Sequence, residues 1–302
     1  MKVGNTLEGS RIILGCMRIS QMKNAEIVSL IEASADCGID YFDHADIYGG
    51  GKSEEVFAKA LKDSSLKREK IILQSKCAIH DGMYDFSKEH ILSSVDRILK
   101  RLDTDYLDVL LLHRPDALME PEEVAESFDC LQTSGKVRNF GVSNHNPIQI
   151  KLLQKYVKQP LIANQMQFSI TNASMIHRGI NVNTEFDGAV DRDGGVLDFC
   201  RLNDITVQAW SPIQFGFFGG TFLGNTEKFP ELNKVLNKLA EKYNCDISAI
   251  AISWILRHPA KIQAVLGTTT KERVAAQAKA AEIVLTRAEW YEIYKAAGNK
   301  LP

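Results

Sequence analysis

Short apolar runs alternate with longer amphipathic segments along the whole chain of 302 residues, and this alternation constrains the fold more than any other feature. The apolar runs lie at 11–16, 41–43, 70–76, 106–112, 136–142, 161–165, 205–210 and 263–266. Between them apolar residues recur with helical spacing, which predicts helices near 25–36, 53–61, 88–102, 121–134, 148–156, 196–202, 231–243, 247–257 and 271–281. Fully apolar strands separated by helices indicate a parallel sheet whose two faces are covered.

About eight strand-plus-helix units, repeating every 30 to 40 residues or so, predict a (β/α)8 TIM barrel. No linker or change of composition divides the chain, so we expect a single domain over 1–302. No G-x-G-x-x-G follows the first apolar run, which argues against a doubly wound dinucleotide-binding fold. We expect a short N-terminal strand to cap the barrel, and the capping-box pair Thr286 and Glu289 predicts an extra C-terminal helix. Segments 168–195 and 212–226 are expected to be irregular loops.

Charge and hydropathy exclude several classes of protein. The 36 Lys and Arg residues nearly balance the 38 Asp and Glu residues, and no basic cluster offers the phosphate contacts that nucleic-acid binding needs. The longest nearly apolar stretch, 249–256, is far shorter than the roughly 18 residues of a membrane span. The six cysteines are scattered without a C-x-x-C pair or zinc-site spacing. We therefore expect no membrane or nucleic-acid partner, no metal, no signal peptide and a cytoplasmic location.

Four titratable residues follow three consecutive predicted strands, at the end of the barrel where such folds place their chemistry. Asp43 and Tyr48 follow the second strand, Lys76 ends the third, and His113 follows the fourth. Each residue alone has a structural interpretation as a helix cap, a loop anchor, a solvated lysine or a hydrogen-bonded core histidine. Because the barrel makes these strand ends converge, the set favours a catalytic site.

The chemistry of this set suggests proton transfer to a carbonyl oxygen. A tyrosine has an ordinary pKa near 10 and is a weak acid at neutral pH. A neighbouring Lys76 ammonium is expected to lower the pKa of Tyr48, and Asp43 would keep that lysine charged and oriented. Tyr48 would then be a general acid, with His113 hydrogen-bonded to the same substrate oxygen. A nicotinamide would deliver the hydride.

Several segments resemble the aldo-keto reductase superfamily, and its bacterial oxidoreductase branch in particular. They are GIDYFDHADIYGGGKSE (38–54), ILQSK (72–76), YLDVLLLHRPD (106–116), GKVRNFGVSNH (135–145), ANQMQFS (163–169), VQAWSP (207–212) and LGTTTKERV (266–274). They match in order and spacing over essentially the whole chain. The resemblance implies a (β/α)8 barrel that binds NADPH, with Asp43, Tyr48, Lys76 and His113 as its catalytic tetrad.

The resemblance also implies how the nicotinamide end of the cofactor is held. Ser143, Asn144 and Gln165 match positions that bind the carboxamide. Trp210 falls where an aromatic ring stacks on the nicotinamide, and its indole offers a large face for that contact. The residues implied along the pyrophosphate are Ser211, Pro212 and the backbone of Ile213.

At the adenosine end the match to the family is incomplete. Thr268 and Arg273 match residues near the 2′-phosphate, and Gln277 falls at the usual adenine position. Gly267 stands where the family has a lysine, and we expect Lys271 to compensate. The other implied cofactor-binding position in this run is Thr269. A preference for NADPH over NADH follows, smaller than in family members that carry the lysine.

The resemblance implies NADPH-dependent, reversible reduction of aldehydes or ketones to alcohols. Met17, Phe215 and Phe217 are candidates for an apolar substrate pocket, although the phenylalanines could instead form the core of their own loop. The alternative function is a cofactor-sensing regulatory protein, since potassium-channel β subunits share the resemblance and keep the tetrad. A metal-dependent barrel hydrolase is a third hypothesis, supported only by His44 and His145 near strand ends.

Overall fold

A computed structural model of the protein describes residues 1–302, and in it eight parallel strands close into a barrel. The strands are β3 (Ile12–Gly15), β4 (Tyr41–Asp43), β5 (Ile72–Cys77), β8 (Leu107–Leu112), β9 (Val137–Ser143), β10 (Leu161–Gln167), β11 (Thr206–Trp210) and β12 (Gln263–Leu266). Strand β12 pairs with β3 in the register Val265–Ile13, which closes the ring. The predicted (β/α)8 barrel is confirmed.

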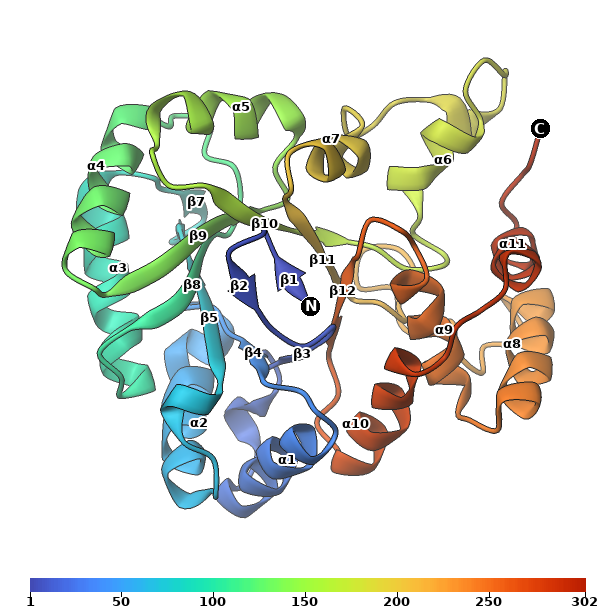
Figure 1. Cartoon of the computed structure of the whole chain (residues 1–302), viewed down its shortest axis with the longest axis horizontal. Helices are drawn as coiled ribbons and strands as arrows, with labels where there is room; N and C mark the ends of the chain where they lie inside the picture. Colours follow the sequence, from blue (N-terminus) through green and yellow to red (C-terminus); the bar gives the residue numbers. More distant parts are fainter.

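Helices surround the ring of strands (Figure 1). They are α1 (Asn24–Asp36), α2 (Lys52–Asp63), α3 (Lys88–Leu102), α4 (Pro121–Thr133), α5 (Pro147–Tyr156), α6 (Ser174–Ile180), α7 (Val196–Leu202), α8 (Pro230–Tyr243), α9 (Ile247–Leu256), α10 (Lys271–Ala278) and α11 (Arg287–Ala296). The predicted C-terminal helix α11 packs on α8. No helix has the combination of length and apolar character that a membrane crossing requires.

Helix α3 shows how the local sequence sets these elements. Ser87 caps its first turn by accepting a hydrogen bond from the His90 backbone N–H at 3.3 Å. Its apolar stripe, which includes Ile91, Val95 and Ile98, is fully buried against the barrel. Spacing of three and four residues keeps these side chains on one face, so the burial of that face fixes the helix on the sheet.

An antiparallel hairpin of β1 (Lys2–Val3) and β2 (Leu7–Glu8) precedes the barrel. In Figure 1 it lies within the outline of the ring of strands, with the N-terminus beside it. Val3 is fully buried in a small core with Ile13 and Ile162 from the barrel interior. The hairpin is the predicted N-terminal cap, and the chemistry-bearing strand ends face the other way.

Three local features differ from what the sequence predicted. Segment 168–195 is not wholly irregular, because it contains α6 (Ser174–Ile180) and the 3-10 turn Asp187–Ala189. Helix α1 begins at Asn24, one residue before its predicted start, with Lys23 in the capping position. A second hairpin, β6 (Ile79–His80) and β7 (Met83–Tyr84), follows β5 and had not been expected.

Candidate active site

Lys76, Asp43 and Tyr48 meet at the C-terminal ends of β4 and β5. The Lys76 ammonium is fully buried and lies 2.7 Å from the Asp43 carboxylate. It also donates to the backbone oxygen of His44 at 2.8 Å and to the Tyr48 hydroxyl oxygen at 3.1 Å. Three acceptors thus use the three N–H donors of the ammonium. Because Lys76 donates to the Tyr48 oxygen, the hydroxyl proton of Tyr48 is free to point into the cavity.

A network of amides inside the barrel holds Asp43 in place. Gln74 donates to Asp43 Oδ1 at 2.6 Å, and Gln165 donates to the same oxygen at 3.0 Å. Both amides also donate to Gln208, at 2.9 and 3.1 Å. These contacts supply the buried carboxylate with hydrogen-bond donors in addition to Lys76, as a buried charge requires.

Burial and the tetrad charges act in opposite directions on Tyr48. Burial raises the pKa of Tyr48 above its ordinary value, and the attraction of Lys76 offsets only part of that effect. The expectation that Lys76 lowers the pKa of Tyr48 overall was therefore wrong, because the cost of desolvating a phenolate exceeds the gain from the lysine. Burial works to lower the pKa of Lys76, yet the attraction of Asp43 and Tyr48 outweighs it and the pKa is raised.

His113 lies beside Tyr48, with the two rings edge to face and their centroids 6.1 Å apart. Burial holds the pKa of His113 well below its ordinary value, and the Lys76 and Arg114 charges lower it further. The imidazole is therefore neutral at physiological pH. Its buried Nδ1 has no hydrogen-bond partner within the protein.

A cavity of about 840 Å³ opens beside these residues. Asp43, Tyr48 and His113 line it, while Lys76 lies behind them. The residues implied for cofactor binding that also line it are Ser143, Asn144, Gln165, Trp210, Ser211, Pro212, Ile213, Gly267, Thr268, Arg273 and Gln277. One continuous cavity therefore joins the tetrad to most of these positions.

The nicotinamide end of this cavity is built from β9, β10 and β11. Ser143 donates to the Gln165 backbone oxygen at 2.9 Å, and Asn144 donates to Ser143 Oγ at 2.8 Å. Trp210 Nε1 donates to Asn144 Oδ1 at 3.3 Å, which fixes the indole at the cavity wall. The amide N–H groups of Gln165 are used inside the barrel, so its amide oxygen is left for a ligand. An aromatic face beside the free amide oxygen of Gln165 suits a nicotinamide with its carboxamide.

The adenosine end differs in two residues from what the sequence implied. Gly267, Thr268, Arg273 and Gln277 line the cavity, whereas Thr269 and Lys271 do not. Lys271 is exposed at the start of α10, and Arg273 lies one half-turn further on with no hydrogen bond or ion pair within the protein. Arg273 is thus the cation that this end of the cavity offers to a phosphate.

The substrate end only partly follows the prediction. Met17 lines the cavity, but Phe215 and Phe217 do not, and Phe218 does so instead. Phe215 packs on Phe229 with ring centroids 5.3 Å apart, so it belongs to the core of its own loop.

Further residues that line the cavity were missed by the sequence reasoning; they include Arg18, Ile47, Ile79 and Arg114. The two arginines could have been predicted to line the cavity, because they directly follow Met17 and His113 at strand ends.

The two histidines that supported a metal-dependent hydrolase are packing residues. His44 is fully buried against Phe57, and its ring nitrogens have no partner. His145 Nδ1 lies 2.9 Å from the Ser143 backbone oxygen. Burial lowers the pKa of His44 to about 3 and of His145 to about 4. Neither histidine lies in a group of three potential metal ligands.

Comparison with known proteins agrees with this geometry. The family model described as "Aldo/keto reductase family" matches residues 11–297. YcsN of Bacillus subtilis, named as an uncharacterized oxidoreductase, is 36% identical over 100% of this chain and 99% of its own. The 6-dehydroglucose reductase of Agrobacterium fabrum is 34% identical over 99% of this chain and 97% of its own.

The solved structures give the same answer for the fold. The crystal structure of the thermostable aldo-keto reductase Tm1743, in complex with the inhibitor epalrestat, superimposes with a TM-score of 0.76 and 26% identity over 98% of each chain. The family model matches nearly the whole length of the chain, and the relatives named here are oxidoreductases, so these comparisons agree on one family. The chain belongs to the aldo/keto reductase family and is similar to bacterial oxidoreductases of that family.

Proposed function

We propose that this protein reduces aldehyde or ketone carbonyls to alcohols with NADPH, in a reversible reaction. The observation that carries the proposal is the position of the Tyr48 hydroxyl. Its oxygen accepts a hydrogen bond from buried Lys76, while the residue itself lines the cavity beside His113. A phenol held in this way can give its proton to a substrate oxygen, and Lys76 then stabilises the phenolate that remains.

The other tetrad residues position this proton transfer. Asp43 compensates the buried charge of Lys76 and fixes its direction. Neutral His113 donates a hydrogen bond to the carbonyl oxygen as negative charge develops on it, which stabilises the transition state.

The chemistry that NADPH would supply, when bound, is the transfer of a hydride to the carbonyl carbon. Ser143, Asn144 and Gln165 would hold the carboxamide, for which the amide oxygen of Gln165 is a free acceptor, and the Trp210 indole would cover one face of the ring. Ser211, Pro212 and Ile213 would border the pyrophosphate. Thr268 and Arg273 would bind the 2′-phosphate, with Gln277 beside the adenine. The free guanidinium of Arg273 supports NADPH over NADH.

The substrate end combines apolar and cationic side chains. Met17, Ile47 and Phe218 supply apolar surface, and Arg18 and Arg114 supply charge. A relative named 6-dehydroglucose reductase shares this length and family. A substrate panel should therefore contain aromatic and aliphatic aldehydes, dicarbonyls and 6-dehydroglucose.

The six unpaired cysteines suit a reducing compartment, so we place the protein in the cytoplasm.

The replacement Tyr48→Phe tests the proposal. It removes the proton donor and keeps the ring, so kcat should fall at least about 100-fold. The Kd for NADPH, measured by quenching of tryptophan fluorescence, should stay within about twofold because the cofactor-binding residues are untouched. Turnover retained by Tyr48→Phe would show that another group gives the proton. NADPH binding by the unmodified protein without turnover of any carbonyl would favour the cofactor-sensing alternative.

A further inference from the structure

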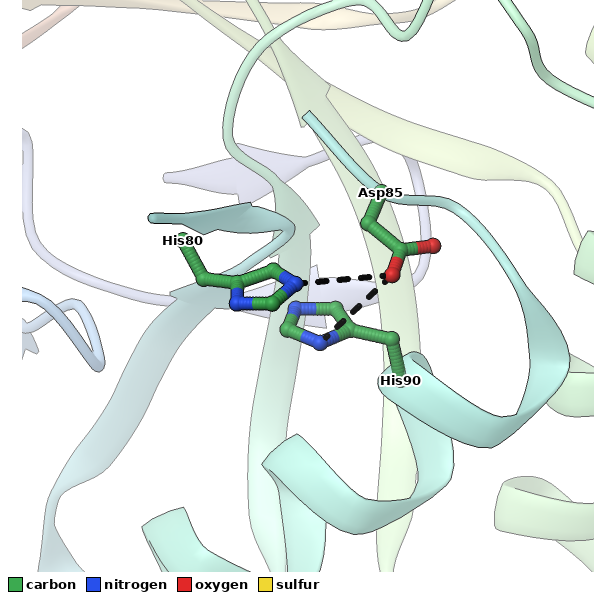
Figure 2. Close-up of side chains that lie close together, drawn as sticks. All are labelled: His80, Asp85 and His90. Atoms are coloured by element: carbon green, nitrogen blue, oxygen red, sulfur yellow. Dashed lines mark ion pairs between the residues drawn. The ribbon is translucent and has the colours of Figure 1, made fainter. Parts of the chain in front are cut away.

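Three potential metal ligands gather outside the tetrad, where the β6–β7 hairpin meets the start of α3. His80 ends β6, Asp85 follows β7, and His90 lies in the first turn of α3. One ligand atom from each residue lies within 4.8 Å of the other two. Figure 2 shows the three side chains turned toward one another from these separate parts of the chain. It is the one group of three such residues in the structure.

The spacing of the ligand atoms is close to that of a bound cation. His80 Nε2 lies 3.6 Å from Asp85 Oδ2, and His90 Nδ1 lies 4.0 Å from the same oxygen. A tetrahedral zinc ion with bonds of about 2.1 Å would hold its ligand atoms roughly 3.4 Å apart. The two distances to Asp85 exceed this spacing by about 0.2 and 0.6 Å, and all three ligand atoms lie within 4.8 Å of one another.

Each ligand is supported from its far side. His80 Nδ1 lies 3.1 Å from Asp81 Oδ2, and His90 Nε2 lies 3.3 Å from Ser94 Oγ. Asp85 Oδ1 accepts the Ser87 backbone N–H at 2.8 Å. Metal-binding histidines typically have such a partner on the other ring nitrogen, because it fixes the tautomer and the ring orientation. Here those contacts leave His80 Nε2 and His90 Nδ1 as the ring nitrogens that lie near Asp85 Oδ2.

The three side chains differ in how far they are buried, from His90, which is the most buried, to His80, which is the most exposed. The side chain of His90 is 9% exposed, that of Asp85 27% and that of His80 36%. The open side toward His80 leaves room for water as a fourth ligand.

We propose that His80, Asp85 and His90 bind a divalent transition-metal cation, with Zn²⁺ as the best match. Two imidazole nitrogens and one carboxylate oxygen suit Zn²⁺ better than Ca²⁺ or Mg²⁺, which prefer oxygen ligands. The two rings are stacked with centroids 4.5 Å apart and an angle of 16° between their planes. Because imidazole lone pairs lie in the ring plane, binding turns the rings out of this stack until both point at one centre.

The cation would tie the hairpin to α3. Ile79, the neighbour of His80 on β6, lines the large cavity, so the site braces one wall of that cavity without touching the tetrad. The proposal does not depend on the reductase function, and metal binding is measured without turnover.

The test uses the full chain, treated with chelator and dialysed, in a Cys130→Ser background that removes the exposed thiol as a competing zinc ligand. Calorimetric titration with ZnCl₂ at pH 7.5 should give one site with micromolar or tighter affinity. Co²⁺ should give the visible absorption bands of a four-coordinate site. His80→Asn and Asp85→Asn, on an exposed hairpin and its flank, should each weaken Zn²⁺ binding at least about 100-fold.

His258→Ala is the matched control, because it removes a histidine that lies outside the group. It should leave the affinity unchanged. The proposal is overturned if the Cys130→Ser protein takes up no Zn²⁺, or if binding survives both His80→Asn and Asp85→Asn. Loss of binding in His258→Ala alone would also overturn it, since the metal would then sit elsewhere.

Discussion

In Tyr48, the proposed proton donor, burial and the charge of Lys76 have opposite effects on the pKa of the phenol. Burial raises the pKa of its phenol, so the proton stays on Tyr48 until a substrate oxygen needs it. Lys76 opposes that effect and stabilises the phenolate once the proton has left. The site is thus suited to a proton donor that is fully loaded at neutral pH.

This balance predicts the pH dependence of the two reaction directions. Carbonyl reduction needs the neutral phenol, so kcat should stay flat from about pH 6.5 upward and fall only above about pH 10. Alcohol oxidation needs the phenolate and should accelerate toward high pH. Steady-state profiles in both directions measure this. A break in the reduction profile near pH 6.5 would contradict the assignment, because the pKa of His113 lies well below that value.

At the residue scale, the proposed preference for NADPH depends on Arg273 and Gly267. Arg273→Ala removes the free cation at the adenosine end of the cavity and should weaken NADPH binding roughly 10- to 100-fold while changing NADH binding little. Lys271→Ala, whose side chain lies outside the cavity, is the control and should leave the ratio of the two Kd values unchanged.

Gly267→Lys tests the same point in the opposite direction. A Cβ at Gly267 would meet nothing within 4 Å, so a lysine fits there and should raise the preference for NADPH. Fluorescence titrations of each variant with both cofactors give the ratios. Equal affinity of the unmodified protein for NADPH and NADH would refute the assignment of the phosphate site.

At the scale of elements, periodicity and caps were sufficient for most of the barrel. Strands β4 (Tyr41–Asp43) and β12 (Gln263–Leu266) and helix α7 (Val196–Leu202) begin and end where the pattern put them. Helix α6 was missed because it has only seven residues. So short a helix shows little apolar periodicity, and the Asn, Asp and Gly residues around it are typical of a loop. The β6–β7 hairpin was missed because its two-residue strands are held by pairing with each other rather than by an apolar pattern.

Part of the site followed from the same reasoning. Convergence of strand ends in a parallel barrel brought Asp43, Tyr48, Lys76 and His113 together, as predicted. The places of Phe215, Phe217 and Phe218 depend on how one long loop folds back, and no strand fixes that path. The metal-ligand group was missed because His80, Asp85 and His90 are joined by a turn that the sequence pattern did not reveal.

Glu289 links α11 to α8, and from its lowered pKa we predict how the free energy of unfolding depends on pH. It completes the capping box with Thr286, and its carboxylate accepts hydrogen bonds from Lys242 at 2.5 Å and Tyr243 at 2.8 Å. Burial opposes ionisation, but the Lys242, Thr286 and Tyr243 contacts outweigh it and lower the pKa of Glu289 to about 2. A lowered carboxyl pKa stabilises the fold above the unfolded-state value near 4.5 and loses that effect as the pH falls toward 2.

Glu289→Gln should therefore reduce the free energy of unfolding by about 1–2 kcal/mol at pH 7. The difference from the unmodified protein should shrink as the pH falls from about 4.5 toward 2. Urea unfolding across this pH range measures both. Glu227→Gln is the control, since Glu227 makes no hydrogen bond or ion pair and should cost nothing measurable. A Glu289→Gln deficit that persists unchanged at pH 3 would show that the charge of Glu289 is not responsible.

At the scale of the whole molecule, the N-terminal hairpin that closes the barrel and the cavity that holds the tetrad lie at opposite ends of the barrel. The N-terminal hairpin closes one end through Val3, while the tetrad and the large cavity occupy the other end. Barrel folds generally carry function at the C-terminal strand ends and stability at the opposite face. A change in the hairpin should therefore alter unfolding without altering turnover.

Gly4→Ala tests that separation. Gly4 has φ +54°, and an added Cβ would lie 2.4 Å from Cβ of Ile162, on a barrel strand that cannot easily move. Overpacking and backbone strain together should cost about 2–4 kcal/mol of unfolding free energy. Gly38→Ala is the matched control, because Gly38 has φ +72° but open space around its Cβ, so only the backbone strain remains. If Gly4→Ala changed kcat or the Kd for NADPH more than about twofold below its unfolding transition, the two ends of the barrel would be coupled and the separation would fail.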